Sequence, residues 1–167
     1  TLDAGGLSAD RAVQTEGRAQ HGTGEIIGEF QIFIPSVSVT SIGQGGGSIA
    51  WVDELGMLKV GPRSAGSTPG PASYGKGGTE PTVTDAAAVC GLIGHSDLGY
   101  SAVRLDVAAA REAIGQLAGR LGAGLEETAA SILDLSVSAM YADASGLISR
   151  FGLDVRDFRM LAFGGAG

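Results

Sequence analysis

The sequence predicts an α/β domain, of the α+β type with a mixed sheet, because its two halves differ in hydrophobic periodicity. Residues 1–82 alternate short β-branched stretches with glycine-rich loops, whereas residues 83–157 carry apolar side chains at helical spacing. A last apolar run at 158–163 predicts one further strand. With 167 residues, 44% of them hydrophobic, the chain is long enough for one domain with its own core.

The strands of the first half are marked by two stretches. EIIGEFQIFIP is the clearest β-type segment. IAWVDELGMLKVG predicts a hairpin whose strands cover 49–52 and 57–60, joined by a tight polar turn. Residues 61–82 hold four of the five prolines, which predicts a long loop, and such loops in compact domains are more often functional than idle.

The helices of the second half have recognisable ends. Asp106 is the expected N-cap of a helix over 107–121, and Gly122 is its stop signal. A longer helix is predicted from 125 to about 151, with apolar residues all round, which favours a buried helix with close neighbours. The run VTDAAAVCGLIG predicts a short apolar helix in which Cys90 is a buried small hydrophobe.

Charge and composition argue against several classes of protein. A formal net charge of -7 without a Lys/Arg stripe gives no footprint for nucleic acid. One cysteine, with no signal peptide and no apolar run of about 18 residues, predicts a cytoplasmic protein that neither enters a membrane nor forms an internal disulfide. His21 and His95 have no second His or Cys at ligand spacing, so no metal site is predicted from them.

The 29 glycines cluster in GGLS, GQGGGS, GKGG and FGGAG, which indicates tight backbone loops. GPASYGKG lacks the Ser or Thr that a P-loop needs after its lysine, and TEPTV is not a helix start. IGQGGGSI is followed by a strand and not by the helix of a dinucleotide site. Neither motif is therefore predicted to bind a nucleotide in the usual way.

The opening DAGGLSAD is the better phosphate-binding candidate. Paired glycines let backbone N–H groups approach a phosphate, and an aspartate before them can hold a magnesium-bound water or polarise a nucleophile. A β-turn with two solvated carboxylates would have the same sequence, so the spacing alone leaves both interpretations open.

A resemblance runs along the whole chain. The order of DAGGLSAD, SIGQGGGSIAWVD, LKVGPRSAGSTPGPASYGKGGTEPTVTDA and RDFRMLAFGGAG resembles the hydantoinase A / 5-oxoprolinase family, and 60–85 is close to that family's consensus. Members of the family resemble the actin, sugar-kinase and heat-shock ATPases, in which ATP lies between two related α/β domains. The resemblance implies that 1–167 is a single partial domain, a fragment of the second of these domains.

The resemblance also implies a site for ATP and Mg²⁺. Asp3 and Asp10 match the catalytic positions, with Asp3 holding Mg²⁺ through water. The implied nucleotide-binding residues are Gly5, Gly6, Ser8, Gly164, Gly165 and Gly167. The chain departs from the family at Leu7, where threonine is common, and at Ala87, where asparagine is usual.

Substrate- or anion-binding candidates are Arg63, Ser48, Glu80 and Asp85. The Arg63 guanidinium, amid glycines, has the geometry to clamp a phosphate or carboxylate, and a structural salt bridge is an equal alternative. Asp85 opens the helix after the long loop, so it is either a helix cap or a site residue, and the cap is favoured.

The implied activity belongs to the parent protein. Such an enzyme uses ATP to phosphorylate a lactam or cyclic-imide carbonyl so that water opens the ring, with a preceding N-terminal domain and a hydantoinase B-type subunit as partners. An ATP-dependent ketone carboxylase subunit of the acetone type, and a non-catalytic fragment lacking half of the nucleotide cleft, are the alternatives. The isolated chain is expected to be inactive.

Overall fold

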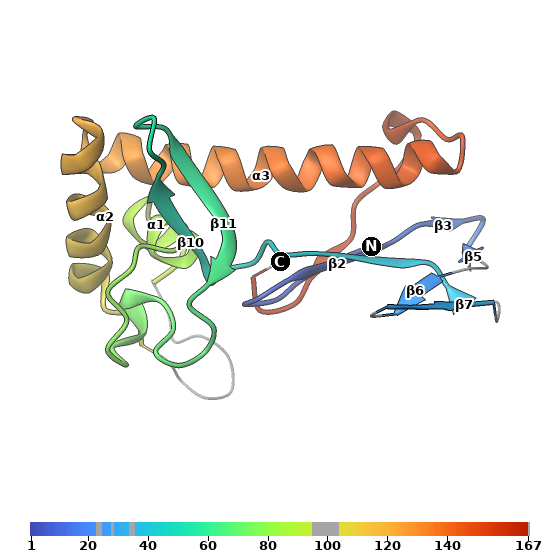
Figure 1. Cartoon of the computed structure of the whole chain (residues 1–167), viewed down its shortest axis with the longest axis horizontal. Helices are drawn as coiled ribbons and strands as arrows, with labels where there is room; N and C mark the ends of the chain where they lie inside the picture. The colour runs from blue at the N-terminus through green and yellow to red at the C-terminus, as the bar shows by residue number, and fades with distance from the viewer. Residues whose placement is uncertain (23–24, 28, 34–35, 95–103, 167) are drawn as a thin grey trace.

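The 26-residue helix α3 (Leu125–Arg150) runs along the length of the molecule, and two groups of shorter elements pack against it (Figure 1). One group is mostly helical, with one hairpin, and the other is a sheet with short hairpins beyond it. This computed structural model describes residues 1–22, 25–27, 29–33, 36–94 and 104–166. Helices and a mixed sheet are both present, so the predicted mixed α/β fold is confirmed.

The helical region surrounds the larger hydrophobic core. Its elements, besides the first half of α3, are β10 (Ser48–Val52), β11 (Leu58–Ser64), the 3-10 helix η1 (Ala72–Tyr74), α1 (Val83–Val89) and α2 (Val107–Leu121). Its buried apolar residues are Ala50, Ala86, Ala88, Val89, Leu105, Ala110, Ile114, Leu117, Ala129 and Ile132. The hairpin β10–β11 therefore covers helices and does not join the larger sheet.

The ends of α2 follow the sequence signals. Asp106 accepts a hydrogen bond from the Ala109 N–H at 3.0 Å, and Gly122 stops the helix in the left-handed region with φ 66°. In α3, the Thr128 hydroxyl donates to the Gly124 carbonyl at 2.8 Å in the first turn. Both predicted helices are confirmed.

The sheet region has a much smaller core. Its strand order is β12 (Ala162–Phe163), β1 (Leu2–Ala4), β2 (Ala9–Ala12) and β9 (Val39–Ile42). β12 runs parallel to β1, and the other neighbours are antiparallel, so the sheet is mixed. Its buried apolar residues are Leu2, Ala4 and Ala9, which pack with Ile42 and with Met140 of α3.

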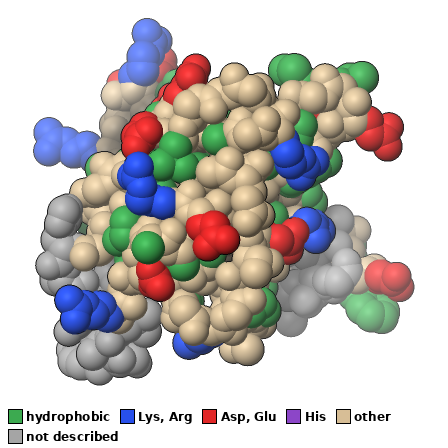
Figure 2. Space-filling view, turned by 90° about the vertical axis from the view of Figure 1, so that its left-hand side faces the viewer, with side chains coloured by type: hydrophobic (Ala, Val, Ile, Leu, Met, Phe, Trp, Pro, Cys, Tyr) green, Lys and Arg blue, Asp and Glu red, His purple; other side chains and the backbone are tan. Residues whose placement is uncertain are grey.

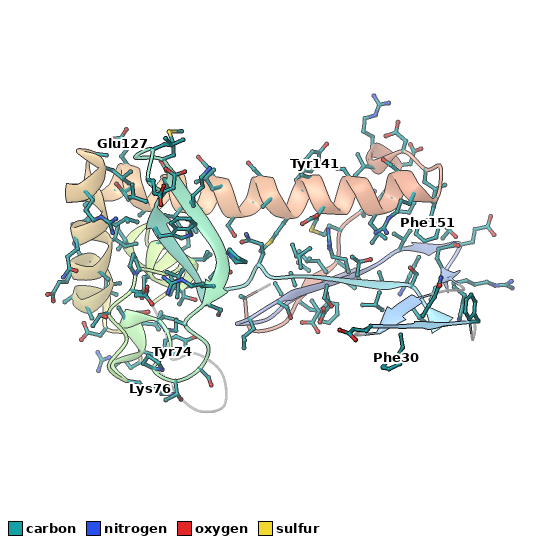
Figure 3. The ribbon with its side chains drawn as sticks, in the orientation of Figure 1. Phe30, Tyr74, Lys76, Glu127, Tyr141 and Phe151 are labelled. Carbon is teal, nitrogen blue, oxygen red and sulfur yellow. The ribbon has the colours of Figure 1, made fainter. Side chains whose placement is uncertain are left out.

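Short two-stranded ladders lie beyond this sheet. They pair β3 (Gln14–Thr15) with β4 (Arg18–Ala19), β5 (His21–Gly22) with β8 (Ser36–Val37), and β6 (Glu25–Ile27) with β7 (Phe30–Ile32). EIIGEFQIFIP is thus divided between β6 and β7, because Gly-Glu interrupts its apolar run. Phe30, labelled in Figure 3, is 76% exposed in β7.

Two sequence predictions need correction in their extent. The loop predicted over 61–82 begins only after Ser64, because a ladder irregularity between Ser48 and Ala50 lets β11 continue past its proline, and η1 interrupts the rest of the loop. The strand predicted over 158–163 shrinks to its last two residues, since only these pair with β1.

Two predictions of burial were also wrong in part. Cys90 is exposed, because it follows the last turn of α1 as its C-cap residue. Helix α3 is buried only along one stripe, formed by Thr128, Ala129, Ile132, Ser136 and Leu147. Val137 and Tyr141 lie on its exposed side, so the helix is not surrounded within this chain.

At the end of the molecule that carries α2, the described residues form no patch of a single charge sign. Figure 2 shows Lys and Arg side chains there interspersed with Asp and Glu. Within the described residues, no helix is both long and apolar enough to span a membrane.

Candidate functional site

Three glycine-rich turns meet at one end of the sheet. They are the β1–β2 turn at 5–8, the loop at 45–47 before β10, and the turn at 164–166 after β12. Backbone hydrogen bonds join them: the Gly46 N–H donates to the Gly5 carbonyl at 3.0 Å and the Gly47 N–H to the Gly6 carbonyl at 2.8 Å. The Ala166 N–H donates to the Ala4 carbonyl at 2.8 Å, so residues from both ends of the chain form one cluster.

This convergence requires glycine at two positions in particular. A Cβ at Gly45 would lie 2.5 Å from the Gly5 carbonyl oxygen, closer than real side chains allow. A Cβ at Gly164 would overlap the Asp3 Oδ1 atom, and Gly164 also has a φ of 95°, in the left-handed region. The FGGAG turn therefore packs its backbone directly against the Asp3 carboxylate.

Asp3 and Asp10 are direct partners in the β1–β2 ladder. Residues opposite each other in an antiparallel pair share one face of the sheet, so the two carboxylates lie side by side. The Ser41 hydroxyl, from β9, donates to Asp10 Oδ1. The Asp3 carboxylate has no hydrogen bond or ion pair with another described residue. Two adjacent carboxylates, one of them unpartnered, favour a cation or its hydration water between them.

The turns also present backbone donors without acceptors. In the described part of the chain, the N–H groups of Gly6, Leu7 and Gly165 make no hydrogen bond. The Ser8 carbonyl accepts from the Gly5 N–H at 2.9 Å, which closes the first turn and leaves its tip, Leu7, 63% exposed. Free N–H groups next to a carboxylate pair fit a phosphate bound with a hydrated Mg²⁺.

The predicted nucleotide-binding and catalytic residues thus lie together, except Gly167, whose position the structure does not describe. Asp3, Asp10, Gly5, Gly6, Ser8, Gly164 and Gly165 are all in or beside the three-turn cluster. Gly167 lies outside the described residues, as does His95. Among the described residues, no three His, Cys, Asp or Glu side chains gather as a metal site. A cation at Asp3 would therefore keep most of its water ligands.

The hydroxyl groups of Ser48 and Thr84 hold the loop at 45–48 in place. Ser48 is fully buried, and its Oγ accepts from the Gly45 N–H at 2.9 Å. Thr84, in the first turn of α1, donates to the Gly46 carbonyl at 2.8 Å from both its hydroxyl and its N–H. Ser48, predicted as a substrate or anion contact, is thus occupied in shaping the loop. Thr84 was missed, and its only sequence signal is its place after the N-cap in TVTDA.

Asp85 acts as the cap of α1. Its carboxylate is fully buried and accepts from the Thr82 N–H at 2.9 Å and from the Thr82 hydroxyl at 2.8 Å. It also accepts from the N–H groups of Ala72 at 3.2 Å and Ser73 at 2.8 Å, which ties η1 to α1. Of the two roles left open by the sequence, the structure shows the cap.

Arg63 and Glu80 form an ion pair at 2.7 Å, with both side chains at least half exposed. They border a cavity of 510 Å³ between β11 and the proline-rich loop. Ser64 lines the same cavity and donates to the Gly6 carbonyl at 3.3 Å, so the cavity lies next to the three-turn cluster. The loop beyond it carries Lys76, whose Nζ lies 5.9 Å from the Tyr74 ring centre (Figure 3).

Known proteins are similar to this chain in sequence and in fold. The family model described as hydantoinase/oxoprolinase matches residues 1–167. Caprolactamase subunit alpha of Pseudomonas jessenii is 41% identical over 99% of this chain and 24% of its own length. Acetophenone carboxylase gamma subunit of Aromatoleum aromaticum is 40% identical over 99% of this chain and 23% of its own length. Both relatives are named as subunits, and the chain spans about a quarter of each.

A solved structure shows the same arrangement of the chain. The crystal structure of ATP-dependent caprolactamase from Pseudomonas jessenii matches with a TM-score of 0.88 at 41% identity, over 98% of this chain and 24% of that one. The similarity extends across both cores and the three-turn cluster, because almost no residue is left out. The match to the family model covers every residue, and the chain therefore belongs to the hydantoinase/oxoprolinase family.

Proposed function

We propose that the three-turn cluster binds the phosphates of ATP in an enzyme that opens cyclic amides. The observation that carries this proposal is the Asp3 carboxylate, which has no partner of its own and lies against the Gly164 backbone beside free N–H donors. Similarity to an ATP-dependent caprolactamase supplies the substrate class.

Each residue of the cluster has a distinct task in this proposal. Gly5, Gly6 and Ser8 form the turn that surrounds the phosphates, in which the Gly5 N–H closes the turn on the Ser8 carbonyl and the Gly6 N–H is free to donate. Gly164 and Gly165, with Gly167, form the turn against which the rest of the nucleotide packs. Asp3 binds Mg²⁺ through water, and Asp10, oriented by Ser41, accepts hydrogen bonds from the same water shell. ATP with Mg²⁺ would supply the phosphoryl group for the amide oxygen, which would make the carbonyl carbon more electrophilic, so that water adds there and the ring C–N bond breaks with the amine as leaving group.

The substrate side is proposed to face the Arg63–Glu80 cavity, because Ser64 connects its wall to the Gly6 carbonyl. The cavities at Arg11 and at Arg63 are lined by residues other than Asp3 and the three glycine turns. Because the relatives are subunits about four times as long as this chain, we expect the opposite wall of the nucleotide site to come from an N-terminal domain of a longer protein, with a hydantoinase B-type subunit as partner. ATP is available in the cytoplasm, where we expect the enzyme to work.

A ketone carboxylase is the second candidate. Identity to the acetophenone carboxylase subunit, 40%, is almost the same as identity to the caprolactamase subunit, 41%. Both reactions would use the same phosphate cluster, so the difference lies in the substrate cavity.

A substrate panel tests the proposal on the longest natural form of the protein. Phosphate release from ATP is measured with caprolactam, 5-oxoproline, hydantoin, and acetophenone or acetone with bicarbonate. We expect one cyclic amide to stimulate turnover, and Asp3→Asn to lower it by about a hundredfold or more without changing the melting temperature. Asp53→Asn, in the β10–β11 turn, is the matched control.

The outcomes separate the candidates. Stimulation by a ketone with bicarbonate alone would favour the carboxylase. If Mg·ATP does not bind and no compound stimulates phosphate release, the chain is a scaffold and the proposal fails.

A further inference from the structure

Arg11 is a buried cation with no hydrogen-bond or ion-pair partner for its side chain among the described residues. Its side chain is 4% exposed, and its Nε and Nη1 atoms are buried without a hydrogen bond. Burial lowers the pKa of its guanidinium, and the charge of Arg150 lowers it further, whereas Asp143 raises it. No ion pair between Arg11 and Asp143 forms in the described chain, and Asp143 itself is exposed.

The guanidinium borders a cavity that is larger than the one at Arg63 and Glu80. This space of 690 Å³ lies between β1–β2, the second half of α3 and the segment at 153–161. Its apolar wall includes Leu2, Met140, Leu147, Ile148, Leu153 and Leu161. Its volume is typical of sites that bury a small organic molecule.

This cavity is separate from the nucleotide cluster. Arg11 pairs with Leu2 in the β1–β2 ladder, whereas Asp3 pairs with Asp10. Successive residues of a strand point to opposite faces, so Arg11 lies behind the sheet and Asp3 in front of it. A ligand behind the sheet is thus not a part of the proposed ATP site.

An unpaired guanidinium in an apolar cavity calls for an anion of a particular kind. A buried charge without a partner is unfavourable, and a planar guanidinium matches the two oxygens of a carboxylate. The apolar wall favours a singly charged anion with a hydrocarbon body over a strongly hydrated phosphate dianion. We propose that Arg11 and this cavity form a binding site for a carboxylate attached to an apolar body.

Two sources share this chemistry: a free aliphatic carboxylate, or an Asp or Glu side chain on an apolar stretch elsewhere in a longer protein. The test uses n-octanoate as probe and octanamide as its uncharged counterpart, in calorimetric titrations of the longest natural form. Octanoate is expected to bind at least about tenfold more tightly than octanamide, as for a buried charge-assisted hydrogen bond. Arg11→Gln is expected to remove this preference.

The matched control is Arg159→Gln. Arg159 lines the same cavity but is exposed, so its loss is expected to change octanoate affinity by less than about threefold. If both variants lose the same octanoate affinity, the cavity attracts anions only by its general positive charge, and the proposed site is wrong.

A second readout distinguishes an internal carboxylate. If octanoate does not bind, and Arg11→Met lowers the melting temperature while Arg11→Lys restores part of it, a carboxylate of the longer protein fills the site. If octanoate does not bind, and Arg11→Met melts at the same or a higher temperature than the wild type, no anion is bound there and the proposal is wrong.

Discussion

The two regions beneath α3 differ in how much they bury. In the described residues, the helical region has a core of ten buried apolar residues, whereas the sheet region has three. The sheet region instead holds the unpartnered Arg11 and Asp3 and, at the edge β12, the exposed Phe163. The comparison indicates that the helical region supplies most of the stability, and that the unpartnered charged groups lie where packing is sparse.

The loop at 45–48 joins the two regions. On one side Thr84 holds its Gly46 carbonyl, and on the other its N–H groups hold the carbonyls of Gly5 and Gly6. The three-turn cluster therefore depends on the helical core for its geometry, although most of its residues come from the sheet region.

The strongest test of this difference is a pair of core substitutions. Ile132→Ala removes a fully buried side chain from the helical core and is expected to lower the free energy of unfolding by about 4 kcal/mol. Met140→Ala truncates a half-buried side chain over the sheet core, so a loss of about 1 kcal/mol is expected. Urea denaturation measures both, and equal losses would contradict the comparison.

The next effect concerns the Asp85 carboxylate. Asp85→Asn keeps the shape but removes a charge that accepts four hydrogen bonds, so a loss of about 3 kcal/mol is expected. Thr84, the preceding residue, holds the Gly46 carbonyl of the loop at 45–48. Asp85→Asn is therefore expected to disturb that loop and to weaken Mg·ATP binding as well. Asp134→Asn, on the exposed side of α3, serves as control and should leave both the thermal midpoint and ATP affinity unchanged.

Two glycines of the cluster should behave differently. Gly45→Ala places a Cβ against the Gly5 carbonyl and is expected to lower stability by about 2 kcal/mol. Gly6→Ala meets nothing within 4 Å, so stability should change by less than about 0.5 kcal/mol. A methyl group there still lies beside the free N–H groups, and calorimetry should show weaker Mg·ATP binding. Unchanged ATP affinity in Gly6→Ala would count against a phosphate at this turn.

The smallest expected effect is on acid stability. Hydrogen bonds from Arg156 lower the pKa of Asp154 in the sheet region, and those from Arg111 lower the pKa of Glu126 in the helical region. A carboxyl whose pKa is lower in the folded state adds stability above its unfolded pKa, near 4, and loses it as the pH falls through the folded value. In each of the variants Asp154→Asn and Glu126→Gln, the melting temperature should depend slightly less on pH below about pH 4. Both groups are exposed, so a large change in either variant would be unexpected.

The sequence predicted the helical region better than the sheet region, for a physical reason. Asp106 and Gly122 are local signals that define a helix within one stretch of chain. The parallel pairing of Leu2 with Ala162 joins distant ends of the chain, and no local pattern specifies it. The length of β12 and the burial of Arg11 depend on that pairing, so neither was predicted.

The sequence grouped residues that the structure brings together in the three-turn cluster, but it did not predict the contacts between them. The resemblance grouped Asp3 with Gly164, and the structure places the backbone of one against the carboxylate of the other. The supporting contacts of Ser48 and Thr84 were not foreseen, because a hydroxyl that shapes a loop and one that faces a ligand have the same sequence signature.

Helix α3 contributes side chains to both cores, with Ile132 in one and Met140 packed on the other. Its 26 residues span about 39 Å at 1.5 Å per residue. The first half of the helix is held by the well-packed helical region, and its second half extends over the sheet region. A tilt of about 5° within the helical region would move the far end by about 3 Å. The second half of α3 lines the cavity that holds Arg11, so a small tilt of the helix within the helical region would widen or narrow that cavity.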